Sequence, residues 1–176
     1  MAVERARLFA QRSTSADAPD RLLRIYLNDQ LALGVVWREL ARRAQTASEG
    51  TPDGDTLRAV ATAIAEDVVT FQKVMRRLGF NTRTPKAAAA IVAERLGRLK
   101  LNGRLLKRSP LSHFEELDTL IMGIDGKVVL WQNLRDGADL GTRLPEIDFD
   151  RLVERAREQR AQLEPLHAQA AREALR

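Results

Sequence analysis

The sequence predicts an all-α fold: an up-down bundle of four long helices with an additional crossover helix. Apolar residues recur at intervals of three and four along most of the 176-residue chain, which is the spacing of amphipathic helices. Glycine and proline gather in short segments, such as 50–54 and 136–141, that separate these periodic stretches. β-Branched residues nowhere alternate with polar ones over more than a few positions, so no strand is predicted.

The composition is that of one globular domain. Hydrophobic residues make up 44% of the chain and charged residues 30%, which is enough apolar material for a real core. Residues 1–19 are polar and end in a run of small residues and a proline, so we expect a flexible N-terminal tail there. A single helical bundle domain is expected over residues 20–176.

Several classes of protein are excluded by what the chain lacks. It contains no cysteine, which excludes disulfides, thiolate metal sites and cysteine nucleophiles. Its uncharged stretches are far shorter than the roughly 18 to 20 apolar residues that span a bilayer. Residues 1–10 also lack the apolar centre of a signal peptide. We therefore expect a soluble, cytoplasmic protein without membrane contact.

The first two helices are predicted from apolar stripes. Asp20 is a favourable N-cap, and apolar positions follow it with helical spacing, so the first helix is expected over about 21–46. A second stripe runs from Leu57 to Leu78 and is ended by Gly79.

A third helix is predicted in the middle of the chain. Thr84 and Pro85 form a typical helix start, and the run 87–106 consists mainly of strong helix formers. Gly97 and Gly103 lower the helical propensity of this run.

The last two helices follow from caps and periodicity. Ser112 and Glu115 have the spacing of a capping box, and the fourth helix is predicted from there to about Arg135. A final periodic segment begins at Phe149, and Pro165 within it is expected to kink or split the fifth helix.

The connections predict the topology. Short connections make the first two helices one antiparallel pair and the last two another, so the middle helix is the crossover. This layout resembles the ferritin-like architecture. The segments Tyr26–Gln30, Gly97–Leu105 and Arg108–Ser112 resemble those of a family of uncharacterised actinobacterial helical-bundle proteins. The resemblance implies a ferritin-like bundle and no particular activity.

A metal centre is not expected. Ferritin-like di-iron proteins carry Glu-x-x-His motifs on two helices and single glutamates on two others. Glu164 and His167 have this spacing, but Pro165 distorts the turn between them, and the second predicted helix contains Glu66 without any histidine. We therefore expect no metal site, no cofactor and no catalytic residue set.

Polar residues on apolar stripes predict a buried polar network. An unpaired buried polar group costs about 1 to 3 kcal/mol, so these residues should find partners. Arg95 and Arg98 project on the leucine side of the third helix and are expected to pair with Asp67, Asp118 or Glu116. The alternative to a structural network is a cavity in which these polar residues have a chemical role. The candidates for the network are Gln30, Asp67, Arg95, Arg98 and Gln159.

One segment carries the basic character of the chain. Between Asn81 and Arg108 lie eight basic residues and one acid, so this window carries +7, whereas the whole chain carries +5. Four of these cations gather on one side of the third helix and are candidates to bind the phosphates of nucleic acid or another anionic partner. A solvated helix face is the simpler interpretation. These four residues are Lys100, Arg104, Lys107 and Arg108.

Other conspicuous residues are assigned to packing. Gly123 and Gly126 are predicted to let a neighbouring helix approach closely, with a hinge as the alternative. Five aromatic residues sit on apolar stripes and are predicted to lie in the core: Trp37, Phe71, Phe114, Trp131 and Phe149.

No motif in the chain specifies a reaction, and an enzyme is the less favoured interpretation. We predict a non-catalytic helical-bundle module for binding or interaction, including self-association as a homo-oligomer. The first alternative is a binder of nucleic acid or another anionic partner through the basic helix face. The second is a ferritin-like carboxylate-metal oxidoreductase.

Overall fold

The computed structural model describes residues 2–81 and 109–176, with side chains from residue 20 onward. These residues form helices and turns without a strand, which confirms the predicted all-α class. The third predicted helix, with Arg95 and Arg98, lies outside the described residues. The helices are α1 (Ala2–Ala47), α2 (Gly54–Arg77), α4 (Pro110–Gln132), the π-helix η1 (Asn133–Gly137), α5 (Leu140–Arg143) and α6 (Phe149–Leu175).

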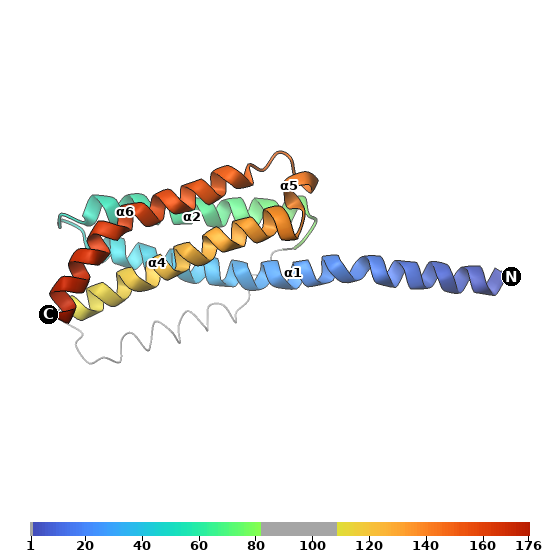
Figure 1. Cartoon of the computed structure of the whole chain (residues 1–176), viewed down its shortest axis with the longest axis horizontal. Coiled ribbons are helices and arrows are strands. Elements are labelled where there is room, and N and C mark those ends of the chain that lie inside the picture. The colour runs from blue at the N-terminus through green and yellow to red at the C-terminus, as the bar shows by residue number, and fades with distance from the viewer. Residues whose placement is uncertain (1, 82–108) are drawn as a thin grey trace.

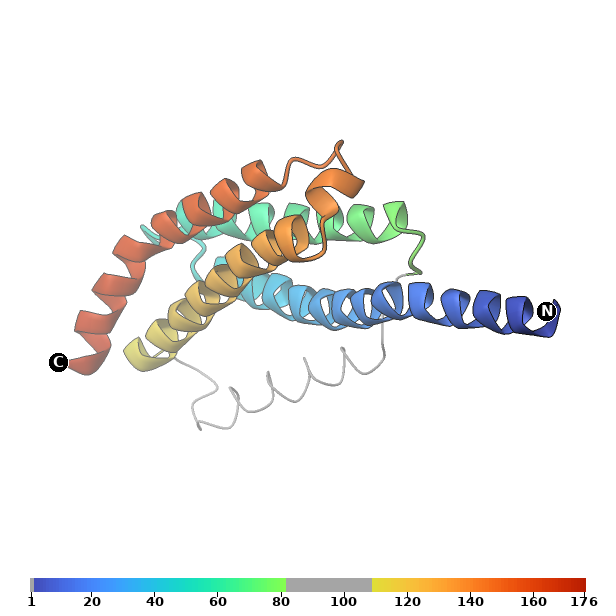
Figure 2. The same ribbon diagram turned by 45° about the vertical axis from the view of Figure 1, so that its right-hand side comes forward.

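The four long helices form two antiparallel pairs (Figure 1). The most extensive contacts are those between α4 and α6 and between α1 and α2. These pairs agree with the short connections in the sequence. The contacts of α1 with α4 and of α2 with α6 are sparser and join the two pairs. In both views α2 and α4 run in the same direction (Figures 1 and 2).

Helix α1 is much longer than predicted. The sequence placed its start near residue 21, but the helix begins at Ala2 and projects beyond the other helices (Figure 1). Residues 2–12 are mainly alanine, glutamate, arginine and leucine, which are strong helix formers, and helix propagation then carries the backbone through 13–19. The flexibility expected for 1–19 stays a prediction.

The end of α2 follows the sequence closely. Gly79 has φ +72°, and its amide donates to the Arg76 carbonyl at 3.0 Å, while the Phe80 amide donates to the Met75 carbonyl at 2.9 Å. This is a Schellman motif, in which glycine adopts the left-handed conformation without strain.

The start of α4 corrects the sequence analysis. The predicted cap was Ser112 with Glu115, but the N-cap is Ser109, whose Oγ accepts a hydrogen bond from the Ser112 amide at 3.1 Å. Pro110 then occupies the first helical position, where it needs no backbone donor. The N-cap therefore lies three residues earlier than the one that was predicted.

The second half of the bundle departs from the prediction at the end of α4 and agrees with it in α6, where a bend was one of the two expected outcomes. The α-helix ends at Gln132 and continues as the π-helix η1 to Gly137. Asp148 caps α6 by accepting a hydrogen bond from the Arg151 amide at 2.8 Å. Helix α6 is continuous through Pro165, and Figure 2 shows it bent rather than split.

The core consists of two hydrophobic clusters along the bundle axis. The first contains Leu31, Phe71 and Trp131, and the second contains Leu57, Leu117 and Leu163. Trp131, Phe71 and Phe149 are buried, as predicted. Trp37 and Phe114 are only partly buried and pack against the second cluster. They contact the core as predicted, but they are more exposed than core residues are.

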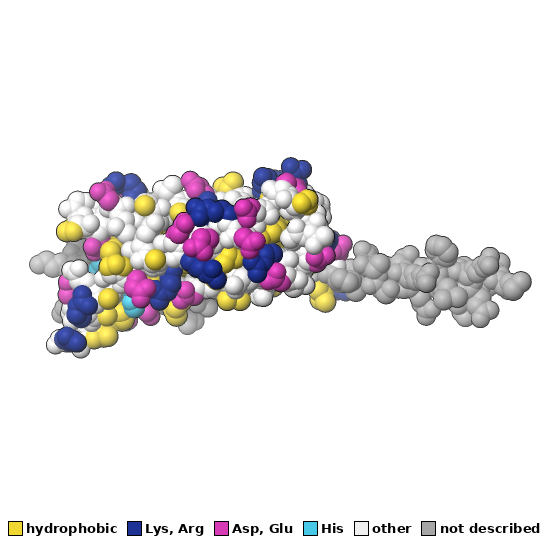
Figure 3. Space-filling view, turned by 45° about the horizontal axis from the view of Figure 1, so that its top comes forward, with side chains coloured by type: hydrophobic (Ala, Val, Ile, Leu, Met, Phe, Trp, Pro, Cys, Tyr) yellow, Lys and Arg dark blue, Asp and Glu magenta, His cyan; other side chains and the backbone are white. Residues whose placement is uncertain are grey.

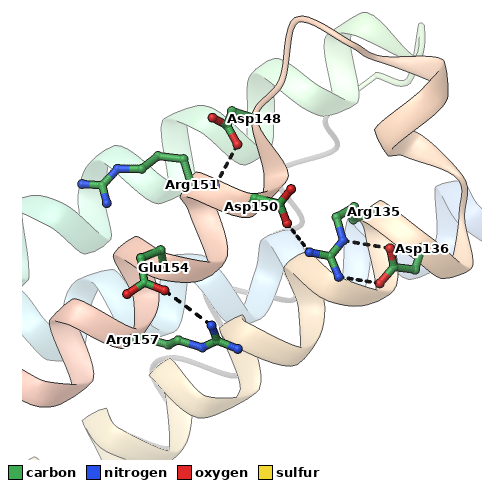
Figure 4. Close-up of polar contacts among 7 residues, drawn as sticks. All are labelled: Arg135, Asp136, Asp148, Asp150, Arg151, Glu154 and Arg157. Atoms are coloured by element: carbon green, nitrogen blue, oxygen red, sulfur yellow. Dashed lines mark hydrogen bonds and ion pairs between the residues drawn. The ribbon is translucent and has the colours of Figure 1, made fainter.

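Ion pairs cover one outer face of the bundle. Basic and acidic side chains are interspersed on the face seen in Figure 3. In Figure 4, Arg135 of η1 donates to both carboxylate oxygens of Asp136, at 2.8 and 2.7 Å, and also contacts Asp150 of α6. Exposed pairs of this kind are screened by solvent and contribute little to stability.

Candidate functional site

Three helices bring polar side chains together inside the bundle. Asp67 of α2 and Gln159 of α6 are 4% and 2% exposed. The Lys127 ammonium of α4 lies 2.5 Å from Asp67 Oδ2 and also donates to Gln159 Oε1. The Gln159 amide donates to the same Asp67 oxygen at 3.0 Å. Each of the three groups therefore contacts the other two.

Arg155 of α6 completes this cluster. Its Nη2 lies 3.1 Å from Asp67 Oδ1 in an ion pair without hydrogen-bond geometry, and 2.9 Å from Glu66 Oε2. The same atom donates to the carbonyl oxygen of Ala63 at 2.7 Å. Two cations therefore face two carboxylates. We call Asp67, Lys127, Arg155 and Gln159 the polar cluster.

The Lys127 amine has an altered acidity. Its side chain is 14% exposed. Burial lowers its pKa because water no longer solvates the ammonium, and Asp67 opposes this effect through its charge and hydrogen bond. Arg155 adds a smaller lowering effect as a like charge. Burial prevails, so Lys127 loses its proton more easily than an exposed lysine does.

The polar cluster borders a cavity of about 470 Å³ between α1, α2 and α4, which we call the α1–α4 groove. Its polar lining includes Tyr26, Gln30, Asp67 and Lys127. Its apolar lining includes Leu31, Trp37, Val68, Phe71, Leu120 and Trp131.

Apolar side chains also surround the opening of the groove. Leu33 of α1 and Met122 and Val129 of α4 line it and are 41%, 58% and 54% exposed. Scattered exposed apolar residues are ordinary, but several around one cavity are typical of a binding surface.

One glycine allows two helices to approach closely beside the groove. A Cβ on Gly123 of α4 would lie 2.7 Å from the Trp37 ring of α1, so the close approach predicted for Gly123 is confirmed. Gly126 has open space instead, and the same prediction for it was wrong because it faces the cavity and not a helix. A Cβ on Gly34 of α1 would meet only Val68, at an ordinary 3.5 Å.

Two of the five predicted members of the polar network contact each other in the structure. Asp67 and Gln159 are hydrogen bonded, as their positions on apolar stripes suggested. Gln30 is only half-buried; it lines the groove beside Asp67 and has no hydrogen bond to any described member of the network. Arg95 and Arg98, the partners expected for Asp67, lie outside the described residues.

Lys127 and Arg155 were missed by the sequence analysis. Lys127 follows Ile124 by three positions and precedes Trp131 by four, so it sits on the buried stripe of its helix. That position could have predicted that Lys127 is buried. The position of Arg155 could not have predicted its role, because a partly exposed arginine at the edge of an apolar stripe resembles any surface arginine.

The predicted metal-type motif is divided between separate pairs. His167 Nε2 lies 2.9 Å from Asp118 Oδ1, whereas Glu164 pairs with Arg160 at 2.5 Å. His113 lies 3.4 Å from Asp53. Within residues 2–81 and 109–176, no three metal-binding side chains gather in one place.

The predicted anion-binding face cannot be placed, since Lys100, Arg104, Lys107 and Arg108 fall between the two described ranges. Among the described helices, none is long and apolar enough to cross a membrane. Comparison with protein-family models, curated proteins and solved structures found no match to the chain.

Proposed function

We propose that this protein is a non-catalytic helical-bundle binding module whose ligand is a small, mainly apolar molecule held in the α1–α4 groove. One observation carries the proposal: a cavity of about 470 Å³ combines mainly apolar walls with a few polar groups. Small-molecule sites are commonly cavities of about 300 to 1,000 Å³ with this composition.

The distribution of exposed apolar residues supports the same function. Leu33, Met122 and Val129 stay in water only at a free-energy cost, which a ligand or partner over the groove would remove. Their position around the cavity gives a bound apolar molecule contacts on both α1 and α4.

A titration with 2-methylnaphthalene tests this function. We expect binding in the micromolar range, followed by calorimetry and by tryptophan emission, because both tryptophans line the groove. Gly34→Leu should lower the affinity at least tenfold, since its side chain enters the cavity without a backbone clash. Ala59→Leu, at an exposed position of α2 that does not line the groove, is the matched control and should bind normally.

Two results would contradict the proposal. One is equal affinity of Gly34→Leu and the wild-type chain. The other is absence of binding by the wild-type chain. Circular dichroism of each variant checks that the fold is retained.

The ferritin-like arrangement with a crossover helix is also a proposal. It is supported by α2 and α4 running in the same direction, since a connection between two such helices must return along the bundle (Figure 1). Membership of the actinobacterial family and a cytoplasmic location stay predictions from the sequence.

The alternative functions rest on the sequence alone. Binding of an anionic partner through the basic face is tested by charge reversal at Arg104 and Arg108, which should abolish retention on nucleic acid at low salt. The carboxylate-metal oxidoreductase is tested by elemental analysis for stoichiometric iron or manganese. Self-association is tested by light scattering over a range of concentrations.

A further inference from the structure

We infer that the Lys127 amine forms a reversible imine with an aldehyde or ketone whose apolar body occupies the α1–α4 groove. The inference rests on the proposed function, because it names the chemical class of ligand that the same groove would hold. It adds covalent capture at one atom, Lys127 Nζ.

The geometry around Lys127 supports this chemistry. Asp67 Oδ2 and Gln159 Oε1 accept hydrogen bonds from Nζ and come from two different helices. A neutral amine has two N–H bonds and one lone pair in a tetrahedral arrangement, so two acceptors fix the direction of the lone pair. Lys127 and Asp67 both line the groove, so the pair that holds the amine borders the cavity.

The surroundings favour the reactive form of the amine. Only the neutral amine attacks a carbonyl carbon, and buried lysines reach this form more readily than exposed ones. The charged groups facing Lys127 are Asp67 from α2 and Arg155 from α6, with Glu66 beyond them. The α1 residues that line the groove are uncharged.

The charge balance favours a neutral ligand. Asp67 and Glu66 already oppose Lys127 and Arg155, so a ligand carboxylate would add an unbalanced charge beside Asp67. An aldehyde or ketone adds no charge, and its carbonyl is the group with which a neutral amine reacts.

The reaction balances without a further reagent. The Lys127 ammonium first loses its excess proton to solvent, so Asp67 stays ionised and still accepts a hydrogen bond from the amine. The lone pair of the amine then bonds to the carbonyl carbon. The two N–H protons of the amine pass to the carbonyl oxygen, which leaves as water while a carbon–nitrogen double bond forms. Addition of water reverses the step and releases the ligand.

Reductive trapping tests the inference. The full chain is incubated with 2-naphthaldehyde and sodium cyanoborohydride at pH 7, and the modified lysines are mapped by mass spectrometry. The chain has few lysines, and the exposed Lys73 of α2 serves as an internal reference. We expect at least about tenfold more adduct at Lys127 than at Lys73, since the groove holds the aldehyde beside Lys127 and burial lowers the pKa of its amine.

Matched variants separate capture from folding. Lys127→Arg keeps a cation beside Asp67 but forms no imine, so the principal adduct should disappear while the circular dichroism spectrum is retained. Lys73→Arg is the control and should leave the Lys127 adduct unchanged. If Lys127→Arg does not fold, the ratio of adduct at Lys127 to adduct at Lys73 in the wild-type chain decides whether the imine forms.

The outcomes distinguish the inference from the proposed function. Preferential labelling of Lys127 supports both. Equal labelling of all lysines, together with normal binding of 2-methylnaphthalene, overturns the imine and leaves the proposed function standing. If neither compound binds or reacts in the groove, both are overturned.

Discussion

Asp67 has an unusual position for a carboxylate, because it is almost completely buried and its two oxygens contact three other polar side chains. Lys127, Gln159 and Arg155 each lie within 3.1 Å of one of its oxygens. A buried charge is tolerated when it is paired and hydrogen bonded, and becomes costly when one partner is removed. The stability of the polar cluster should therefore depend strongly on Asp67.

We expect Asp67→Asn to lower the free energy of unfolding at pH 7 by about 3 kcal/mol, because Lys127 is left without its counter-charge. Denaturant titrations measure this loss. Asp125→Asn is the control: Asp125 is an exposed partner of Arg160 at 3.4 Å, so its loss should change stability by less than about 0.5 kcal/mol. Similar losses in both variants would contradict the role of burial.

The loss in Asp67→Asn should shrink as the pH rises. Removing Asp67 takes away the group that opposes the effect of burial, so the pKa of Lys127 falls further below 10.5. Between the lowered pKa and 10.5, the unfolded chain binds a proton that the folded chain lacks, so unfolding free energy increases with pH. Denaturation from pH 7 to 10 checks the sign, and a loss independent of pH would contradict it.

At the scale of the helices, Gly34 of α1 and Gly123 of α4 should respond oppositely to replacement by alanine. Gly34→Ala should stabilise the protein by about 0.5 to 1 kcal/mol, since alanine favours the helix and its Cβ fits beside Val68. Gly123→Ala should destabilise it by about 1 to 3 kcal/mol, because its Cβ would overlap the Trp37 ring. Equal effects in denaturant titrations would show that α1 and α4 can separate freely.

The elements themselves were largely predictable from local patterns. The apolar stripe of α2 and its end at Gly79 follow from periodicity and from the left-handed preference of glycine. The start of α4 was misjudged because Ser109 and Ser112 are both plausible caps, and only the hydrogen bond to the Ser112 amide identifies Ser109. The length of α1 was missed because weak helix formers in 13–19 do not end a helix that has already begun.

The site was less predictable than the elements. Polar residues on apolar stripes identified Asp67 and Gln159, but their partners depend on which helices become neighbours, and this is decided by packing of the whole chain. Lys127 and Arg155 lie 60 and 88 positions from Asp67 in the sequence. The groove was not predicted because a cavity is what remains between side chains of three helices.

On the scale of the whole molecule, the polar cluster lies at the junction of the two hydrophobic clusters. Along α2, Ile64 belongs to the second cluster and Phe71 to the first, with Asp67 between them. Along α4, Lys127 lies in the same way between Ile124 and Trp131. A polar layer across an otherwise apolar interior favours one register of the helices and carries a stability cost.

Replacing this layer with apolar residues should stabilise the bundle. We expect the triple variant Asp67→Leu, Lys127→Met and Gln159→Leu to gain about 1 to 3 kcal/mol in unfolding free energy, because the two hydrophobic clusters become continuous. For a chain of this size, the gain corresponds to a melting temperature higher by about 2 to 4 °C per kcal/mol. Thermal and denaturant unfolding measure it, with Asp67→Asn as the comparison that leaves a charge unpaired. A triple variant as unstable as Asp67→Asn would mean that the polar layer itself holds the helices together.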